Sequence, residues 1–357
     1  MVVDTSFWRE KRVLVTGHTG FKGGWLCFWL KNLGAQVAGY ALAPPTNPNL
    51  FETADIAGGM QSISGDVRDL NRLKTAVTEF RPEVVFHLAA QSLVRRSYAD
   101  PIETYTTNIM GTLNVLEAVR RAGGVRAIVN VTSDKCYENK ERSRGYREDE
   151  PLGGYDPYSS SKACAELVTA AYRNAYFNPA DSGGHSVALA SARAGNVIGG
   201  GDWAQDRLIP DVMRAFLAGK PVAIRNPHAT RPWQHVLEPS SGYLMLAEQL
   251  WREGARFAEA WNFGPDESDT KPVQWVVEKV AQAWGRPGAW RADKGNHPHE
   301  AALLALDCSK AKEKLGWRPR WSLDRALNAV NEWYQAYRDG KEVVQVMLRQ
   351  VAQYQGS

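Results

Sequence analysis

Tyr158 and Lys162, four residues apart, are the first side chains in this sequence whose types and spacing could do chemistry. They open a helical pattern, and on a helix this spacing places the phenol and the ammonium on one face, about one turn apart. A lysine cation beside a tyrosine stabilises the phenolate and lowers the tyrosine pKa from about 10, which gives a usable base near neutral pH. Because YxxxK also occurs by chance, the pair alone leaves a surface location open.

A second polar group, Ser133-Asp134-Lys135, follows the strand-like residues 127–132. The carboxyl ends of parallel strands are where an open α/β sheet gathers its reacting groups. Ser133 could hydrogen-bond a substrate hydroxyl, while Asp134 and Lys135 could form an acid–base pair. The alternative is a polar loop that only caps the strand. The presence of the tyrosine–lysine pair in the same chain favours a catalytic cluster.

A glycine-rich loop at residues 16–23, TGHTGFKG, places Gly17, Gly20 and Gly23 three apart between a predicted strand and a predicted helix. Because glycine has no side chain, a pyrophosphate can approach the backbone N–H groups and the helix N-terminus at these positions. A tight structural turn would also use glycines, but a strand before the loop and a helix after it favour a dinucleotide site.

The choice between NAD and NADP depends on the next two strands. Near Tyr40 and Leu42, at the end of the second strand, neither a carboxylate for the ribose of NAD nor an arginine for the 2′-phosphate of NADP is obvious. Asp66, after the third strand, could accept a hydrogen bond from the adenine amino group; alternatively it caps a helix that starts near Arg68. We expect NAD.

The elements that position these groups follow a repeating strand–helix pattern. The predicted strands are 12–16, 36–42, 62–66, 84–89, 127–133 and 186–192, and the predicted helices between them include 104–122 and 160–177. This alternation predicts an α/β fold with a doubly wound parallel (Rossmann) sheet.

After about residue 194 the sequence becomes rich in glycine, proline and tryptophan. Predicted helices in this part lie near 207–218, 239–252, 272–284 and 322–338, and residues 341–357 form one more helix or fray. We expect a smaller mixed α/β domain that binds the substrate. The expected division assigns residues 1–192, together with 236–264, to the NAD-binding domain, and residues 193–235 and 265–357 to the substrate domain.

The composition excludes several classes of protein. With 357 residues, 44% of them hydrophobic, the chain suits one large or two modest domains. The net charge of +4 is spread without basic runs, which argues against nucleic-acid binding and an anionic membrane surface. No apolar stretch approaches the roughly 18 residues of a membrane span, and no signal peptide pattern is present, so we expect a cytoplasmic protein. The four cysteines are far apart and form no CxxC pair, so neither disulfides nor a metal is expected.

Segments along nearly the whole chain together resemble one enzyme family. They are TGHTGFKG (16–23), HLAAQSLV (87–94), NIMGTLNVLEAV (108–119), VTSDKCY (131–137), YSSSK (158–162), RAGNVIGGGDW (193–203), RPWQHV (231–236) and LGWRP (315–319). The chain resembles the extended short-chain dehydrogenase/reductases, and within them the nucleotide-sugar 4,6-dehydratases. The resemblance implies a nucleotide-sugar substrate, bound NAD, and a homodimer or homotetramer built through helices equivalent to 104–122 and 160–177.

The resemblance also implies catalytic roles at matching positions. Ser133, Tyr158 and Lys162 would oxidise the sugar at carbon 4. Asp134 and Lys135 would take the place of the acid–base pair that eliminates water across carbons 5 and 6. The dTDP-glucose enzymes have a glutamate where this chain has Lys135, and an ammonium can remove the proton from carbon 5 only if burial or a neighbouring cation lowers its pKa.

The same matching implies two sets of binding residues. For the cofactor they are Gly17, Thr19, Gly20, Phe21, Lys22, Gly23, Asp66, Val67, Leu88, Ala89, Ala90 and Asn108, together with Tyr158 and Lys162. For the nucleotide sugar they are Gln91, Asn196, Arg207, Leu208, Arg225, Arg231 and His299. Arginines suit a diphosphate because the planar guanidinium makes paired, charge-assisted hydrogen bonds.

The strand-end sequence SDK with a retained YxxxK tyrosine is most similar to family members that act on CDP-glucose, whereas the dTDP-glucose enzymes show TDE and the GDP-mannose enzymes TSE. Inverting UDP-N-acetylglucosamine dehydratases carry TDK without the tyrosine, so Tyr158 argues against them. We expect dehydration of CDP-glucose to CDP-4-keto-6-deoxyglucose, a lyase reaction of dideoxyhexose and lipopolysaccharide O-antigen synthesis. The alternatives are a dehydratase for another nucleotide sugar, a 4-epimerase that needs no acid–base pair at 134–135, and, remotely, a non-catalytic NAD-sensing protein.

Overall fold

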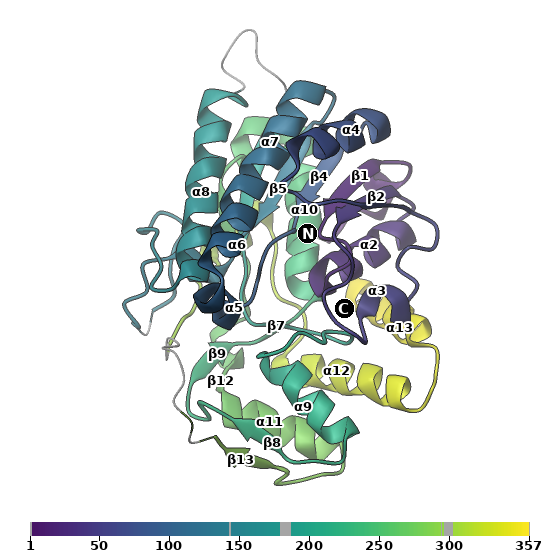
Figure 1. Cartoon of the computed structure of the whole chain (residues 1–357), viewed down its shortest axis with the longest axis vertical. Helices are drawn as coiled ribbons and strands as arrows, with labels where there is room; N and C mark the ends of the chain where they lie inside the picture. Colours follow the sequence, from purple (N-terminus) through teal and green to yellow (C-terminus); the bar gives the residue numbers. More distant parts are fainter. Residues whose placement is uncertain (1, 143, 179–186, 294, 296–302, 357) are drawn as a thin grey trace.

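A parallel sheet of seven strands forms the centre of the computed structural model, which describes residues 2–142, 144–178, 187–293, 295 and 303–356 (Figure 1). The strands are β1 (Arg12–Thr16), β2 (Gln36–Ala41), β3 (Gln61–Ser64), β4 (Val84–His87), β5 (Ala127–Val131), β6 (Ala188–Arg193) and β11 (Ala260–Asn262). Their order across the sheet is β11-β6-β5-β4-β1-β2-β3. The six strands predicted from the sequence are present, and the doubly wound fold is confirmed.

Helices cover both faces of this sheet (Figure 1). On one face lie α4 (Leu70–Phe80), α7 (Gly111–Ala122) and α8 (Pro157–Ala175), and on the other lie α2 (Phe21–Asn32) and α10 (Leu237–Glu253). Alternate residues of β1 join the two cores, since Leu14 packs on the first side and Val13 and Val15 on the second. A strand buried on both faces reads as a continuous apolar run, which explains the sequence RVLVT.

The later part of the chain adds a smaller unit beside the sheet, drawn in green and yellow in the lower half of Figure 1. Its two-stranded pairs are β7 (Val197–Ile198) with β10 (Gln234–His235), β8 (Val222–Ile224) with β13 (Trp290–Ala292), and β9 (Thr230–Pro232) with β12 (Thr270–Pro272). The helices here are α9 (Leu208–Leu217), α11 (Val273–Ala283) and α12 (Leu323–Arg338), and α13 (Val343–Gly356) follows them. Of the two alternatives for the end of the chain, the helix is therefore present over Val343–Gly356.

Short helices complete the architecture. They are α1 (Thr5–Trp8), α3 (Leu50–Thr53), α5 (Val94–Ala99) and α6 (Pro101–Tyr105). A π-helical segment, Thr106–Met110, joins α6 to α7, so the predicted helix over 104–122 contains a local widening. Such π-segments are rare and occur often at functional sites.

The position of β1 decides where a ligand can bind. β1 lies between β2 and β4, so the chain runs outward in both directions from this point of the sheet. Loops after β1 and β4 therefore diverge and leave a crevice at the carboxyl edge, which is the usual ligand site of open α/β sheets.

Two further properties concern the part of the chain that the structure describes. None of its helices combines the length and the apolar character that crossing a membrane requires. It also contains no group of three or more His, Cys, Asp or Glu side chains placed to hold a metal ion.

Glu238, at the start of α10, joins three distant segments in the core. Its carboxylate accepts hydrogen bonds from the backbone N–H of Arg320 (3.1 Å) and of Trp321 (2.7 Å), and from the hydroxyl of Tyr354 (2.7 Å). Burial raises the pKa of Glu238 to about 7, although these hydrogen bonds oppose the rise. The folded protein therefore binds a proton at this position more tightly than the unfolded chain, whose ordinary value is 4.5.

We predict that this group makes stability depend on pH. A pKa that is higher in the folded state stabilises the fold below pH 4.5, and this contribution is lost as pH rises to about 7. Glutamine does not titrate, so Glu238→Gln lacks this pH-dependent loss. Between pH 4.5 and about 7 the free energy of unfolding of the variant, relative to that of the parent, should therefore rise by about 3 kcal/mol. Urea unfolding at several pH values measures this, and parallel pH dependences of parent and variant would contradict it.

Candidate active site

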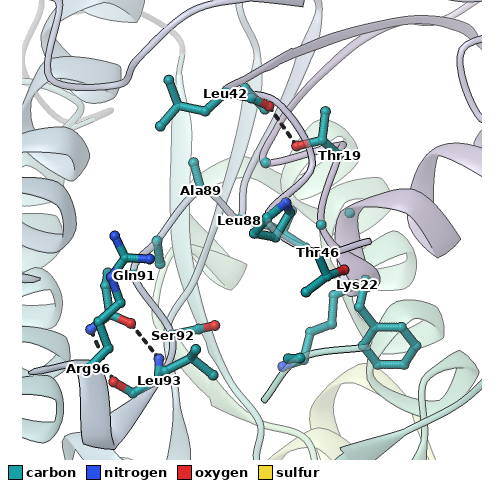
Figure 2. Close-up of a pocket in the computed structure, with 18 of the residues that line it drawn as sticks. Thr19, Lys22, Leu42, Thr46, Leu88, Ala89, Gln91, Ser92, Leu93 and Arg96 are labelled. Atoms are coloured by element: carbon teal, nitrogen blue, oxygen red, sulfur yellow. Dashed lines mark hydrogen bonds between the residues drawn. The ribbon is translucent and has the colours of Figure 1, made fainter. Parts of the chain in front are cut away.

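A cavity of about 1050 Å³ lies at the carboxyl edge of the sheet, where the loops after β1 and β4 diverge. Most of its lining comes from five segments far apart in the sequence: 17–23, 41–50, 65–68, 88–96 and 201–207. Tyr158 and Lys162 of α8 also line it. Figure 2 shows part of this lining as sticks and labels ten of the residues.

The three glycines of the first loop have different tasks. Gly17 has φ +81°, and a Cβ there would lie 2.7 Å from the backbone nitrogen of Ala89. A Cβ at Gly23 would lie 2.1 Å from the carbonyl oxygen of Gly17. At Gly20 the nearest atom would be that same oxygen at 3.4 Å, so the chain itself leaves this position open. Gly17 and Gly23 thus serve packing, and Gly20 faces the cavity.

The open position is also the beginning of a helix. Gly20 is the N-cap of α2 and provides no side-chain cap, so the first N–H groups of this twelve-residue helix have no side-chain capping partner and belong to residues that line the cavity. Such an end attracts anionic groups through its N–H donors and the helix dipole. The loop therefore fits the pyrophosphate of a dinucleotide, as the sequence predicts.

Thr16 fixes the loop after β4, which lines the cavity next to the glycine loop. Its hydroxyl oxygen accepts hydrogen bonds from the backbone N–H groups of Leu88 and Ala89, both at 3.2 Å, and lies 2.7 Å from Nδ1 of His87. The loop Leu88-Ala89-Ala90 is thereby fixed along the cavity next to the glycine loop. All three residues line the cavity, where the resemblance places cofactor contacts.

Asp66 lies at the end of the cavity that faces β2 and β3. Its carboxylate accepts from the backbone N–H of Arg68 at 2.8 Å and forms a two-pronged ion pair with the guanidinium of the same residue. The suggested alternative, that Asp66 caps the next helix, is wrong. α4 begins at Leu70, and its N-cap is Asp69, which accepts from Arg72 N–H at 3.0 Å.

The predicted catalytic residues meet at the ends of β5 and α8. Asp156 caps α8 and Pro157 occupies its first turn, which places Tyr158 and Lys162 on the side that lines the cavity. The side chain of Ser133 hydrogen-bonds that of Tyr158. The tyrosine and the lysine are both buried, so little of either side chain is exposed to water.

Asp134 and Lys135 differ in their surroundings. The Asp134 carboxylate is buried, accepts from Ser133 Oγ at 3.0 Å and lies 3.5 Å from Nδ2 of Asn196. A Cβ at Gly195 would lie 1.8 Å from it, so the absence of a side chain there makes room for the carboxylate. Lys135 is half-buried, and its ammonium forms no hydrogen bond or ion pair with the described residues. Neither residue belongs to the cavity lining itself.

The ionisation of the tyrosine–lysine pair differs from the expectation. Burial raises the pKa of Tyr158 to about 12, although the Ser133 hydrogen bond opposes the rise, and burial lowers the pKa of Lys162 to about 8. The sequence predicted a lowered tyrosine pKa. In the protein alone, the removal of each group from water is the largest cause of its shift, because desolvation penalises each charged form.

Lys22 adds a further positive charge to the cavity. Its side chain extends into the cavity from the first turn of α2 (Figure 2). The pKa of Lys22 is lowered to about 8, mainly by burial and also by the positive charge of Arg207, while the negative charge of Asp134 acts in the opposite direction. An ammonium beside the open helix N-terminus fits a diphosphate ligand.

Most of the predicted cofactor residues line this cavity. They are Gly17, Thr19, Gly20, Phe21, Lys22, Gly23, Asp66, Val67, Leu88, Ala89, Ala90, Tyr158 and Lys162. Asn108 does not. Its Nδ2 donates to the carbonyl oxygen of Gln91 at 2.9 Å and to Ser161 Oγ at 2.8 Å, and its Oδ1 accepts from Gln91 N–H at 2.9 Å. Asn108 therefore shapes the loop that carries Gln91 and lies outside the cavity lining.

The predicted substrate residues are more scattered. Gln91 and Arg207 line the cavity, whereas Asn196, Leu208, Arg225 and Arg231 lie outside its lining, and His299 lies outside the described residues. The side chain of Gln91 is bonded to its own loop, to Leu93 (Figure 2) and Thr104.

Sequence reasoning missed two contacts that close one side of the cavity. Arg207 Nη2 donates to Ser92 Oγ at 2.9 Å, and Arg95 Nη1 donates to Asp206 Oδ1 at 3.1 Å. Both join loop 88–96 to loop 201–207, and Asp206 also accepts from Arg225 Nη1 at 3.2 Å. The only sequence signal was the pair Arg95-Arg96 directly after the segment HLAAQSLV.

Comparison with known proteins identifies the family. The model of the family described as GDP-mannose 4,6 dehydratase matches residues 14–330. The chain belongs to this family. The CDP-glucose 4,6-dehydratase of Salmonella typhimurium is 55% identical over 353 residues, which are 99% of this chain and 98% of that protein.

Two more distant proteins are also similar to this chain. The UDP-glucose 4-epimerase of Mycolicibacterium smegmatis is 28% identical and matches 90% of this chain and 98% of its own. A dTDP-glucose 4,6-dehydratase of Streptomyces venezuelae, solved with NAD bound, is 25% identical, has a TM-score of 0.77, and covers 93% of this chain and 99% of its own.

We predict that Gly20→Val folds but loses NAD. The chain has room for the new side chain, whereas the pyrophosphate would have to share that space. Calorimetry should show loss of NAD binding with little change in melting temperature. Gly23→Ala is the matched contrast, because its Cβ meets the backbone at 2.1 Å and should lower the melting temperature. If Gly20→Val bound NAD as well as the parent, the pyrophosphate would lie elsewhere.

Proposed function

We propose that this protein is an NAD-dependent lyase that converts CDP-glucose to CDP-4-keto-6-deoxyglucose and water. The observation that carries the proposal is 55% identity to a CDP-glucose 4,6-dehydratase along 99% of the chain. The arrangement of Ser133, Asp134, Tyr158 and Lys162 beside the cavity that the glycine loop lines supports it.

Tyr158 and Lys162 carry the oxidation in this proposal. Tyr158 accepts the proton of the sugar 4-hydroxyl, and Ser133, which hydrogen-bonds Tyr158, holds that hydroxyl in line. Lys162 favours the phenolate by its positive charge. Bound NAD supplies a hydride acceptor at carbon 4 and a hydride donor at carbon 6, and the glycine loop, Lys22 and loop 88–90 hold it.

Asp134 and Lys135 carry the elimination. A ketone at carbon 4 acidifies carbon 5, so a base there and an acid at the 6-hydroxyl complete the loss of water. Asp134 is the acid that protonates the departing hydroxyl, and Lys135 takes the position of the base. The UDP-glucose 4-epimerase relative makes epimerisation the second candidate, and the buried Asp134 next to Ser133 is the feature that favours dehydration.

The binding of the sugar nucleotide is assigned to the later part of the chain. Asn196, Arg207, Arg225 and Arg231 are proposed to contact it, with Leu208 and His299. In the same proposal residues 1–192 and 236–264 form the cofactor domain, and residues 193–235 and 265–357 form the substrate domain. We place the protein in the cytoplasm, in the synthesis of dideoxyhexoses for lipopolysaccharide O-antigen.

We further propose a homodimer, or a tetramer made from two dimers, through α6, α7 and α8. Large apolar side chains are exposed on this side of the molecule: 75% for Ile102 on α6, 47% for Met110 beside α7, and 59% for Leu167 on α8. Large exposed apolar side chains on neighbouring helices support an interface there, because such surface is often buried by a partner.

The function is tested with CDP-glucose deuterated at carbon 4. The proposal requires that the label arrives at carbon 6 of the same molecule and that a solvent proton enters at carbon 5, both of which NMR of the product detects. The label returning to carbon 4 with inverted configuration would make the protein an epimerase. Parallel assays with the dTDP, UDP and GDP sugars test the choice of base.

We predict that Tyr158→Phe lowers turnover by about 10²–10⁴-fold, because it removes the proton acceptor of the oxidation. Binding of CDP-glucose should stay near normal, since little volume is lost and the interaction matters in the transition state. Tyr172→Phe is the control, because it removes a hydroxyl from the same helix that only meets Glu117. Near-normal turnover with much weaker substrate binding would contradict the role.

We predict that Asp134→Asn stalls after oxidation. Asparagine keeps the shape of the side chain but cannot protonate the 6-hydroxyl, so on mixing with CDP-glucose the near-ultraviolet absorbance of reduced cofactor should rise and persist. Deuterium from carbon 4 should then fail to reach carbon 6. Asp69→Asn exchanges one good N-cap for another on α4 and serves as the control. Normal product from Asp134→Asn would exclude Asp134 as the acid.

A further inference from the structure

A buried carboxylate, Glu166, lies behind the tyrosine–lysine pair on the same helix. Tyr158, Lys162 and Glu166 are spaced four residues apart on α8, so they share one face. Glu166 is 3% exposed and does not line the cavity. It can therefore act on the reaction only through its neighbours.

The hydrogen bonds of Glu166 connect three elements. Oε1 accepts from Thr132 Oγ1 at 2.5 Å, directly before Ser133 at the end of β5. Oε2 accepts from Ser191 Oγ at 2.6 Å and from Arg193 Nη2 at 2.9 Å, both on β6. The carboxylate thus fixes α8, which carries the tyrosine, relative to the strand end that carries the serine.

Arg193 keeps this carboxylate charged. Burial alone would raise the pKa of Glu166, but the attraction of Arg193 and the hydrogen bonds from Ser191 and Thr132 outweigh it and lower the pKa. Arg193 is in turn held by Tyr137 Oη at 2.8 Å and by the carbonyl oxygen of Glu148 at 3.2 Å. The carboxylate therefore stays charged to lower pH than an ordinary glutamate.

The other titratable groups that interact with Lys162 are neutral or positive near pH 7. His87 on β4 has a pKa lowered to about 3 by burial, and burial raises the pKa of the Cys136 thiol after β5. Tyr158 holds its proton, because its pKa is about 12, and Lys22 of α2 repels Lys162. Among these described groups, Glu166 is the one with a full negative charge, and it opposes the loss of the Lys162 proton.

We propose that Glu166 is a positioning residue for the oxidation step: it sets the distance between Ser133 and Tyr158 and supplies the negative charge that the buried Lys162 ammonium needs. This inference rests on the proposed function, since it assumes that the tyrosine–lysine pair is the oxidation base. It concerns a residue that touches neither sugar nor cofactor.

The test is the pH profile of a single turnover, followed by the absorbance of reduced cofactor, in the parent and in Glu166→Gln. Without the Glu166 carboxylate, the Tyr158–Lys162 pair should lose its first proton at lower pH. The low-pH side of the rate profile (the acid limb) should therefore move to lower pH. The reactive form, with ammonium and phenolate together, becomes rarer, so the maximum rate should fall about tenfold for each pKa unit that Lys162 loses. Binding of CDP-glucose should change little.

Two further variants separate this role from a structural one. Glu166→Gln leaves Arg193 unpaired and can impair folding, so Glu166→Gln combined with Arg193→Gln removes both buried charges and should show the same shift of the limb. Glu248→Gln is the matched control: Glu248 is a buried glutamate on α10 that binds Trp8 Nε1 at 2.8 Å. It should alter melting temperature and leave the profile in place.

The outcomes are distinct. An unshifted limb in Glu166→Gln, or failure of both Gln variants to fold, would make Glu166 a structural residue and overturn the proposal. If CDP-glucose does not reduce the cofactor but another nucleotide sugar does, the substrate assignment fails and the same comparison is made with that sugar. If no nucleotide sugar reduces the cofactor in the parent, the proposed function itself is wrong, and the role of Glu166 with it.

Discussion

Close approach of the backbone at the end of β1 is the constraint on which the rest of the site depends. At Gly17 and Gly23 the chain passes so near to itself and to Ala89 that no side chain fits. Thr16, one residue earlier, binds the N–H groups of the loop after β4. The glycine loop and loop 88–90 are thereby held against each other. Because β5 is the next strand beyond β4, the end that carries Ser133 comes to the same edge of the sheet.

This constraint explains why so much of the fold could be predicted from the sequence. Strands such as β1 and β5 are buried on both faces and read as unbroken apolar runs between turns. The three-residue strand β11 was missed, because Ala260–Asn262 is too short to carry a pattern of its own. The spacing of the glycines predicted a dinucleotide loop, but it could not separate Gly20 from Gly17 and Gly23. Only the backbone positions show that a side chain would fit at Gly20 and not at Gly17 or Gly23.

The site was harder to predict where partners are distant in the sequence. Ser92 and Arg207 are 115 residues apart and Arg95 and Asp206 are 111 apart, so no local pattern connects them. The ionisation of Tyr158 depends on burial, which YxxxK does not encode, and its pKa therefore moves opposite to the expectation. Asn108 was assigned to the cofactor by resemblance, yet its three hydrogen bonds stay within the protein.

The two bridges between loops 88–96 and 201–207 lie beside the cavity assigned to a cofactor that each cycle of the proposed reaction regenerates. They connect the loop after β4 to the loop that leads into α9, and both loops line the cavity. In the proposed reaction the cofactor is reduced and reoxidised within one cycle, so the reaction needs no exchange of cofactor with the surrounding pool. An enzyme built in this way draws no net reducing equivalents, and its output follows the supply of sugar nucleotide and not the ratio of NADH to NAD around it.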